Sequence, residues 1–183
     1  MRDGRPLTGQ NIVLVGFMGS GKTSVGRELA RRLGWEFVDT DALIERMAGR
    51  SIPEIFRERG EPYFRDLESE AIRTATCGTR TVLATGGGAV LRPENMSRLK
   101  AAGLVVLLDA EAEELYRRVV NEGRRPLLEV ADPLARIREL LEYRRPYYAQ
   151  ADLRIDTTGR PVEAIVEEIL KAWKRYVQGH HYL

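Results

Sequence analysis

Residues 16–23 read Gly16-Phe17-Met18-Gly19-Ser20-Gly21-Lys22-Thr23, and this stretch decides the fold of the 183-residue chain. It follows an apolar run of strand length, Ile12–Val15, and precedes a helical pattern that begins near Ser24. In the spacing GxxxxGK[ST] the glycines let the backbone curl, so that successive N–H groups face one centre beside the positive end of a helix dipole. The stretch therefore predicts a phosphate-binding loop between a strand and a helix.

The side chains of this loop have separate tasks. Lys22 is expected to reach the β- and γ-phosphates of a nucleoside triphosphate, and the Thr23 hydroxyl is expected to ligate Mg²⁺. We therefore expect ATP as the phosphoryl donor and Mg²⁺ as the cofactor. The loop residues expected to contact ATP are Gly19, Ser20, Gly21, Lys22, Thr23 and Ser24.

Apolar runs of strand length alternate with segments of helical period along the chain. The runs that predict strands are Ile12–Val15, Glu36–Val38, Thr81–Ala84, Leu104–Leu108 and Leu153–Ile155. The last helical segment repeats apolar residues with the spacing of one buried face, at Val162, Ile165, Val166, Ile169, Leu170 and Trp173. Such alternation indicates parallel strands joined by right-handed crossovers, with ligands at the carboxyl ends of the strands.

The predicted fold is a three-layer α/β/α arrangement with a five-stranded parallel sheet. No repeat or linker divides the sequence, so we expect one domain over residues 1–183 with a core of about 11–176. The polar residues 178–183 are expected to extend past the last helix, and His180 and His181 there are expected to be a frayed tail rather than a metal site.

Composition excludes several functional classes. The net charge is +2 with both signs interleaved, which disfavours a nucleic-acid partner. The longest apolar run, Leu104–Leu108, is too short to cross a bilayer, and Met1–Gln10 carries no apolar segment typical of a secretory signal. The single cysteine, Cys77, fits a reducing compartment and is expected to be a small, half-buried residue. We therefore expect a cytoplasmic protein without membrane or nucleic-acid partners.

Two carboxylates follow the second predicted strand, in Asp39-Thr40-Asp41. Residues two apart on an extended chain face the same side, so one carboxylate is placed to serve Mg²⁺ and the other to accept a hydrogen bond from an acceptor hydroxyl. In many P-loop kinases such a strand lies next to the strand of the phosphate loop. The alternative is that Asp41 is the N-cap of the following helix, since Asp is a preferred capping residue. The pattern alone leaves both interpretations open.

Other segments have patterns that suit a second substrate. Gly86-Gly87-Gly88 follows the third strand, where glycines allow backbone N–H groups to approach a ligand, although a plain flexible turn is the alternative. Residues 124–128, Arg-Arg-Pro-Leu-Leu, lie between two helical patterns and suit a mobile lid. Residues 144–148, Arg-Arg-Pro-Tyr-Tyr, close a helix.

Taken together, the segments GFMGSGKT, DTD, GEPYFRDLE, TGGGAV, RRPLL and RRPYY make the chain resemble the shikimate kinases from about Ile12 to about Glu168. The resemblance implies a P-loop kinase with an acceptor-binding region at about 40–76 and a helical lid at about 122–132. It implies ATP-dependent phosphorylation of the 3-hydroxyl of shikimate, a step of chorismate and aromatic amino acid biosynthesis. We expect a monomer whose partners are its small-molecule substrates, ATP and shikimate.

The resemblance also implies roles for single residues. Asp39 corresponds to the acid that holds Mg²⁺, usually through water, so the implied metal set is Thr23 and Asp39. Asp41 corresponds to the carboxylate that binds the ring hydroxyls and either takes the proton of the attacking hydroxyl or only orients it. Arg125 corresponds to the lid arginine that moves onto the transferring phosphate. The implied catalytic set is Lys22, Asp41 and Arg125.

The remaining correspondences concern binding. Arg65 and Arg144 correspond to the pair that clamps the substrate carboxylate, Gly87 and Gly88 to backbone donors, and Phe56 and Phe64 to apolar walls. With Asp41 these make up the implied substrate-binding set. Arg118 and Arg160 correspond, both loosely, to residues that flank the adenine, and they complete the ATP set with Arg125.

Alternatives remain open at this stage. A kinase of another small polyhydroxy acid, such as gluconate, would share the loop and the lid but does not need Arg65 and Arg144 in this register. A nucleoside-monophosphate kinase would need a clamp for the acceptor phosphate and a base pocket. A catalytically idle nucleotide-gated binding module is a third alternative, which the presence of Lys22, Asp41 and Arg125 disfavours. Asp109, at the end of an apolar run, is expected to be a strand-end residue rather than a second magnesium ligand.

Overall fold

Strands and helices alternate along the chain, as the apolar pattern predicts. The structure is a computed structural model and describes residues 10–120 and 128–180. Its strands are β1 (Asn11–Val15), β2 (Glu36–Asp39), β3 (Thr81–Ala84), β4 (Gly103–Asp109) and β5 (Leu153–Asp156). Each strand matches its predicted range to within one residue at either end.

All five strands are parallel, in the order β2-β3-β1-β4-β5. The expectation that the strand before Asp39 lies next to the loop strand is therefore wrong, because β3 lies between β2 and β1. The physical reason is burial. Every residue of β1 and β3 is buried, whereas every residue of β2 is partly or fully exposed. The more exposed strand, β2, therefore lies at the edge of the sheet.

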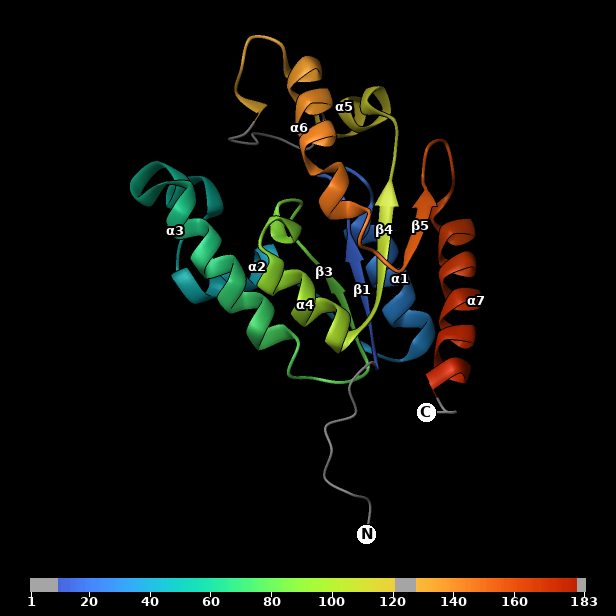
Figure 1. The fold of residues 1–183 in the computed structure, drawn as a ribbon. Coiled ribbons are helices and arrows are strands. Elements are labelled where there is room, and N and C mark those ends of the chain that lie inside the picture. Colours follow the sequence, from blue (N-terminus) through green and yellow to red (C-terminus); the bar gives the residue numbers. More distant parts are fainter. Residues whose placement is uncertain (1–9, 121–127, 181–183) are drawn as a thin grey trace.

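Helices cover both faces of the sheet (Figure 1). On one face α1 (Lys22–Leu33) and α7 (Val162–His180) pack over a core that contains Leu14, Val106 and Val166. On the other face α4 (Pro93–Ala102) and the end of α6 (Pro133–Tyr148) pack over Val13 and Val105. The predicted face of the last helix is confirmed, since Ile165, Val166 and Ile169 are all buried.

Two expectations about exposed segments are wrong. Residues 178–180 belong to α7, so the helix continues beyond the point at which we expected it to end, while His181 lies outside the described residues. Cys77 is exposed rather than half-buried, and it lies in the turn that follows the end of α3. The described part of the chain contains no helix that is long and apolar enough to cross a membrane.

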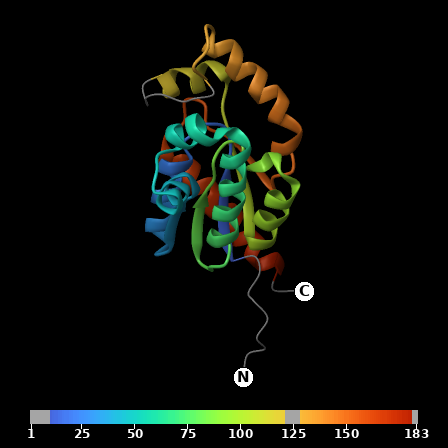
Figure 2. The same ribbon diagram turned by 90° about the vertical axis from the view of Figure 1, so that its left-hand side faces the viewer.

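A separate helical unit stands beside the sheet on the side opposite to α7 (Figures 1 and 2). It consists of α2 (Thr40–Ala48) and α3 (Ile52–Ala75), which share a core of Ile44, Ile55, Phe64 and Ala71. Helix α3 is kinked at Gly60, whose φ of 77° and ψ of 175° are not helical. Two short helical segments therefore meet there, and the second begins with Glu61 and Pro62.

A third unit lies above the carboxyl ends of the strands (Figure 1). Helix α5 (Ala112–Val120) packs against α6 through a core that includes Phe17, Leu115 and Ile137. Most of the predicted lid joins these two helices. Its residues 122–127, with Arg124 and Arg125, lie outside the described residues. Residues 128–132 are described, and Asp132 caps α6 by accepting a hydrogen bond from Ala135 N over 3.0 Å.

Candidate active site

The phosphate loop connects β1 to α1, as the sequence predicts. Gly19 and Gly21 have φ angles of 78° and 94°, which favour glycine and give the loop its curl. Lys22 Nζ donates hydrogen bonds to the carbonyl oxygens of Gly16 and Phe17, both over 2.8 Å. The lysine side chain thus folds back over the concave side of its own loop, where it adds a positive charge to the inward N–H groups.

Thr23 and Asp39 lie side by side at the mouth of this loop. Thr23 Oγ1 donates a hydrogen bond to Asp39 Oδ2 over 3.1 Å, and both residues line a cavity of about 120 Å³ with Gly21, Lys22 and Ser24. A hydroxyl and a carboxylate are oxygen donors of the kind that Mg²⁺ prefers, and Mg²⁺ usually takes only one or two ligands from protein and the rest from phosphates and water. The two residues therefore fit the predicted metal site. Among the described residues no cluster of three or more His, Cys, Asp or Glu could hold a metal by itself.

The two carboxylates of Asp39-Thr40-Asp41 have different structural roles. Asp39 is the N-cap of α2, because its Oδ1 accepts hydrogen bonds from Asp41 N at 2.9 Å and Ala42 N at 3.4 Å. Asp41 lies in the first turn of the helix, so the alternative that Asp41 itself is the cap is wrong. Asp39 and Asp41 do not both lie on an extended chain, so the reason that we gave for their facing the same side does not apply. The tight turn between β2 and α2 nevertheless brings both residues to the wall of one cavity.

That cavity is a pocket of about 360 Å³ between the sheet and the α2–α3 unit. It adjoins the loop cavity, with which it shares Met18, Thr23, Asp39, Asp41, Gly86 and Gly87. The substrate-binding residues that the sequence predicts all line it: Asp41, Phe56, Phe64, Arg65, Gly87, Gly88 and Arg144. The tertiary structure thus brings together residues from five separate segments, and it places them beside the phosphate loop.

Two buried arginines converge on this pocket. Arg65 comes from α3 and Arg144 from the end of α6, and their exposed fractions are 9% and 2%. Within residues 10–120 and 128–180, Nε and Nη1 of Arg144 have no hydrogen-bond partner. The guanidinium instead lies over the ring of Phe17, 5.3 Å from its centroid. A buried cation with unsatisfied donors costs folding free energy, which is typical of a group kept for an anionic ligand.

The glycine turn at residues 86–88 fits between these side chains. A Cβ on Gly88 would lie 2.4 Å from Arg65 Nη1, and one on Gly86 would lie 2.7 Å from Glu68 Oε1. A Cβ on Gly87 would lie 3.2 Å from Arg144 Nη1. None of the three glycines has a positive φ, so close packing and not backbone strain favours glycine at these positions. The close packing favours the interpretation as a shaped turn over that of a plain flexible one.

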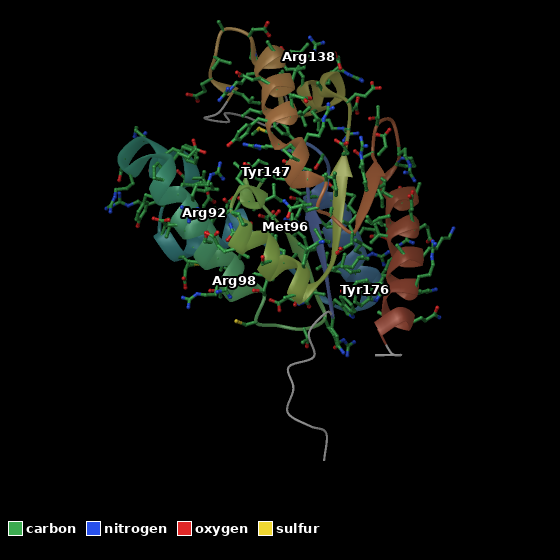
Figure 3. The ribbon with its side chains drawn as sticks, viewed as in Figure 1. Arg92, Met96, Arg98, Arg138, Tyr147 and Tyr176 are labelled. Atoms are coloured by element: carbon green, nitrogen blue, oxygen red, sulfur yellow. The ribbon has the colours of Figure 1, made fainter. Side chains whose placement is uncertain are left out.

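Neighbouring groups hold this turn in place. Gly86 N donates to Thr40 Oγ1 over 3.1 Å, and the Tyr148 hydroxyl donates to Gly87 O over 2.7 Å. Burial raises the pKa of Tyr148 to about 12, so the phenol remains protonated and able to donate. On the outer side Arg92 donates to Asp66 Oδ1 over 2.7 Å and to Ser69 Oγ over 3.1 Å, which ties α3 to the segment after the turn (Figure 3).

Glu68 is a residue of the site that the sequence analysis did not single out. It is fully buried, and its Oε2 accepts a hydrogen bond from Arg65 Nη1 over 2.9 Å. Burial raises the pKa of Glu68, Arg65 opposes this shift, and nearby Asp41 raises the pKa further. The sequence contained a signal for this pair, because Arg65 and Glu68 are three residues apart on a helix and therefore lie on the same face.

The aromatic and adenine-side residues also have defined positions. The rings of Phe56 and Phe64 contact each other at 4.7 Å between centroids and form one wall of the pocket. Arg118 donates to the carbonyl oxygens of Gly19 at 3.2 Å and Thr157 at 3.0 Å. Arg160 N donates to the same Thr157 oxygen, but the Arg160 side chain binds Asp156 O and Glu168.

Asp109 ends β4 and forms an ion pair with Arg154 at 2.6 Å, which agrees with the expected strand-end role. Arg125 lies outside the described residues. The structure therefore places every predicted site residue except Arg125.

Curated sequences with the same pattern span nearly the whole chain. The sequence is 49% identical over 170 residues to a shikimate kinase of Thermodesulfovibrio yellowstonii, covering 93% of this chain and 98% of the relative. It is 54% identical over 164 residues to a shikimate kinase of Symbiobacterium thermophilum, covering 88% and 94%.

Solved structures agree with the sequences. A shikimate kinase from Acinetobacter baumannii in complex with shikimate superposes with a TM-score of 0.86 at 42% identity, covering 90% of this chain and 92% of that one. A gluconokinase from Sinorhizobium meliloti superposes with a TM-score of 0.57 at 19% identity, which shows a shared fold alone. The model of the family described as shikimate kinase matches residues 18–174. The chain therefore belongs to the shikimate kinase family.

Proposed function

We propose that this protein transfers the γ-phosphoryl group of ATP to the 3-hydroxyl of shikimate. The observation that carries the proposal is the pair of buried arginines, Arg65 and Arg144, that face a small pocket directly beside a phosphate loop. A monocarboxylic acid with a hydroxylated ring matches this pocket, because two guanidinium groups can bind its carboxylate with charge-assisted hydrogen bonds. Membership of the family supports the same substrate.

The pocket provides partners for the rest of such a substrate. The rings of Phe56 and Phe64 offer an apolar wall for the face of the carbon ring. Asp41 offers a carboxylate to the ring hydroxyls, and the turn at Gly87 and Gly88 offers backbone N–H groups. Since Asp41 also lines the cavity of the phosphate loop, a hydroxyl bound to it lies on the path to the γ-phosphate.

On the donor side the loop N–H groups and Lys22 would hold the triphosphate. Thr23 and Asp39, which lie side by side, would hold Mg²⁺. The chemistry that Mg²⁺ supplies there when bound is neutralisation of charge on the phosphate oxygens. In this proposal Arg118, which donates hydrogen bonds to Gly19 O and Thr157 O, flanks the adenine.

The reaction itself requires mainly positioning and neutralisation of charge. In this proposal Asp41 orients the attacking hydroxyl and accepts its proton as the new O–P bond forms and the bond from phosphorus to the bridging oxygen of ADP breaks. Lys22 stabilises the negative charge that develops on the transferred group. Arg125 is assigned from the sequence as a third cation, supplied by the segment between α5 and α6.

A comparison of acceptors tests the proposal. ADP release from ATP should be measured in parallel with shikimate, quinate, gluconate and AMP, with and without Mg²⁺. We expect rapid release with shikimate and Mg²⁺ and only background release with gluconate or AMP. Equal or faster turnover of gluconate would assign the pocket to another polyhydroxy acid. Lys22→Met serves as the control, because it should abolish transfer to every acceptor.

A further inference from the structure

The two arginines of the pocket differ in what they already hold. Arg65 binds two carboxylates: Nε and Nη2 donate to Glu61 Oε1 over 3.2 Å and 2.8 Å, and Nη1 donates to Glu68 over 2.9 Å. Among the described residues, Nε and Nη1 of Arg144 have no such partner. Burial alone would lower the pKa of Arg65, but Glu68 and Glu61 more than offset this effect, so the net shift is upward. The positive charge of Arg65, one of the two arginines of the clamp, is therefore already neutralised by carboxylates of the protein.

The two partners of Arg65 are not equivalent. The Glu68 side chain is 1% exposed and packs against Gly86, so it is shielded from solvent although it lines the acceptor pocket. The Glu61 side chain is 48% exposed, and Glu61 is the first residue of the helical segment that follows the kink at Gly60. An ion pair with one solvent-exposed partner contributes less than a fully buried one, because solvent screens it and the exposed side chain loses rotamer freedom. Only Glu61 can exchange readily with another anion.

A second cavity offers Glu61 another position. It has a volume of about 380 Å³ and lies between α3 and α6, where Glu61, Arg136 and Arg144 are among its lining residues. Arg144 lines both this cavity and the acceptor pocket. Glu139 also lines this cavity and already pairs with Arg136, so a carboxylate that leaves Arg65 meets Arg144, whose Nε and Nη1 have no hydrogen-bond partner among the described residues.

Resting on the function proposed above, we infer that Glu61 competes with the substrate carboxylate for Arg65. Its carboxylate holds the Nε–Nη2 edge of the guanidinium, one of the edges on which an incoming carboxylate can bind bidentately. The substrate acid takes this edge and displaces Glu61 toward the cavity between α3 and α6. Glu61 thus helps to determine specificity, because an acceptor without a carboxylate has nothing to exchange for it.

Competition predicts the sign of the mutational effect. If the edge is free only in a fraction of molecules, the apparent affinity for the acid is reduced by that fraction. Removing the competitor should therefore lower KM for shikimate, roughly two- to fivefold for a screened pair of this kind. If Glu61 instead held Arg65 in its binding geometry, its removal would raise KM.

The experiment compares Glu61→Gln and Glu61→Ala with Glu58→Gln. Glu58 lies on the same helix and pairs with Arg50 at the surface, so Glu58→Gln changes the net charge equally without touching Arg65. KM and kcat should be measured for shikimate, for its methyl ester, which lacks the negative charge, and for ATP. We expect both Glu61 variants to lower KM for shikimate only, with kcat and the KM for ATP unchanged, and Glu58→Gln to have no effect.

Other outcomes would count against the competition by Glu61 or against the assignment of Arg65 to the carboxylate clamp. A higher or unchanged KM for shikimate in the Glu61 variants would overturn the inference, as would an equal gain for the methyl ester or for Glu58→Gln. Arg65→Lys tests the assignment of Arg65 to the substrate carboxylate, because loss of the planar guanidinium, which can bind a carboxylate bidentately, should raise KM for shikimate. If Arg65→Lys leaves that KM unchanged, the carboxylate clamp itself is wrongly assigned. If Arg65→Lys raises KM while Glu61→Gln does not lower it, only the competition fails.

Discussion

Thr23 Oγ1 donates a hydrogen bond to Asp39 Oδ2 over 3.1 Å, which joins the first turn of α1 to the end of β2 across the intervening strand β3. Asp39 Oδ1 accepts the capping bonds of α2 at the same time. One carboxylate therefore connects the phosphate loop to the start of the helix that carries Asp41. This connection allows the two aspartates to be tested separately.

Asp39→Asn should weaken the response to Mg²⁺. Asn is as good an N-cap as Asp, so α2 should remain folded, but the negative charge beside Thr23 is lost. An outer-shell partner of a metal typically contributes 10–100-fold to metal affinity or activity, so the Mg²⁺ concentration for half-maximal rate should rise by about that factor. Titration of the rate with Mg²⁺ at saturating ATP measures this. Near-normal activity at high Mg²⁺ is expected, and a loss that excess metal does not rescue would contradict the assignment.

Asp41→Asn should act on the chemical step. Asp41 lies in the first turn of α2 and lines both cavities, where it can meet the attacking hydroxyl. Removal of a group that accepts the proton should lower kcat roughly 10²–10⁴-fold. Steady-state kinetics at saturating Mg²⁺, with the melting temperature as a check of folding, separates this effect from that of Asp39→Asn. If the two variants exchanged phenotypes, the aspartates would be assigned in the wrong order.

Arg144→Met should separate binding from stability. The arginine is 2% exposed, and two of its nitrogens have no partner among the described residues. Methionine fills a similar space over Phe17 without the two unsatisfied donors, so the free energy of unfolding should rise by about 1–3 kcal/mol. KM for shikimate should rise roughly ten- to a hundredfold, since one side of a charge-assisted clamp is lost.

Urea unfolding and acceptor kinetics on the same Arg144→Met preparation measure both effects. KM for ATP is the internal control and should not change. A destabilised variant would mean that Arg144 is held by interactions more favourable than its unsatisfied donors suggest, and an unchanged KM for shikimate would remove it from the clamp.

Glu68→Gln should change how stability depends on pH. Burial raises the pKa of Glu68, with Arg65 opposing the shift, Asp41 adding to it and Arg144 opposing it. A carboxyl whose pKa is higher in the folded state stabilises the fold below its unfolded pKa, near 4.3, and loses this contribution as pH rises through the folded pKa. The stability of the wild type relative to Glu68→Gln should therefore fall as pH rises from about 4.

Urea unfolding of both proteins between pH 4 and pH 8 gives this difference directly. Glu70→Gln is the matched control, because Glu70 lies on the same helix and pairs with Arg73 at the surface. A wild type that gains stability relative to Glu68→Gln over this range would show that the Arg65 charge, and not burial, governs this carboxyl.

The sequence by itself determined the local elements of this protein. The phosphate loop was predictable because its chemistry depends on consecutive residues, Gly16 to Thr23, and on a strand and a helix at either end. The five strands and the buried face of α7 were predictable because apolar periodicity records burial locally. Most of the pocket residues were found only through the resemblance of spaced segments to a family, since none of those segments is specific alone.

The tertiary structure decided everything that depends on which segments meet. The order of the strands places the fully buried β3 beside β1 and the more exposed β2 at the edge of the sheet. Asp39 and not Asp41 became the helix cap because the chain turns directly after β2. The preference for glycine at residues 86–88 arises from Glu68, Arg65 and Arg144, which belong to distant segments of the chain. Close packing between distant segments is a property of the folded chain, so only the fold reveals that Arg65 is already paired and that Arg144 has unsatisfied donors.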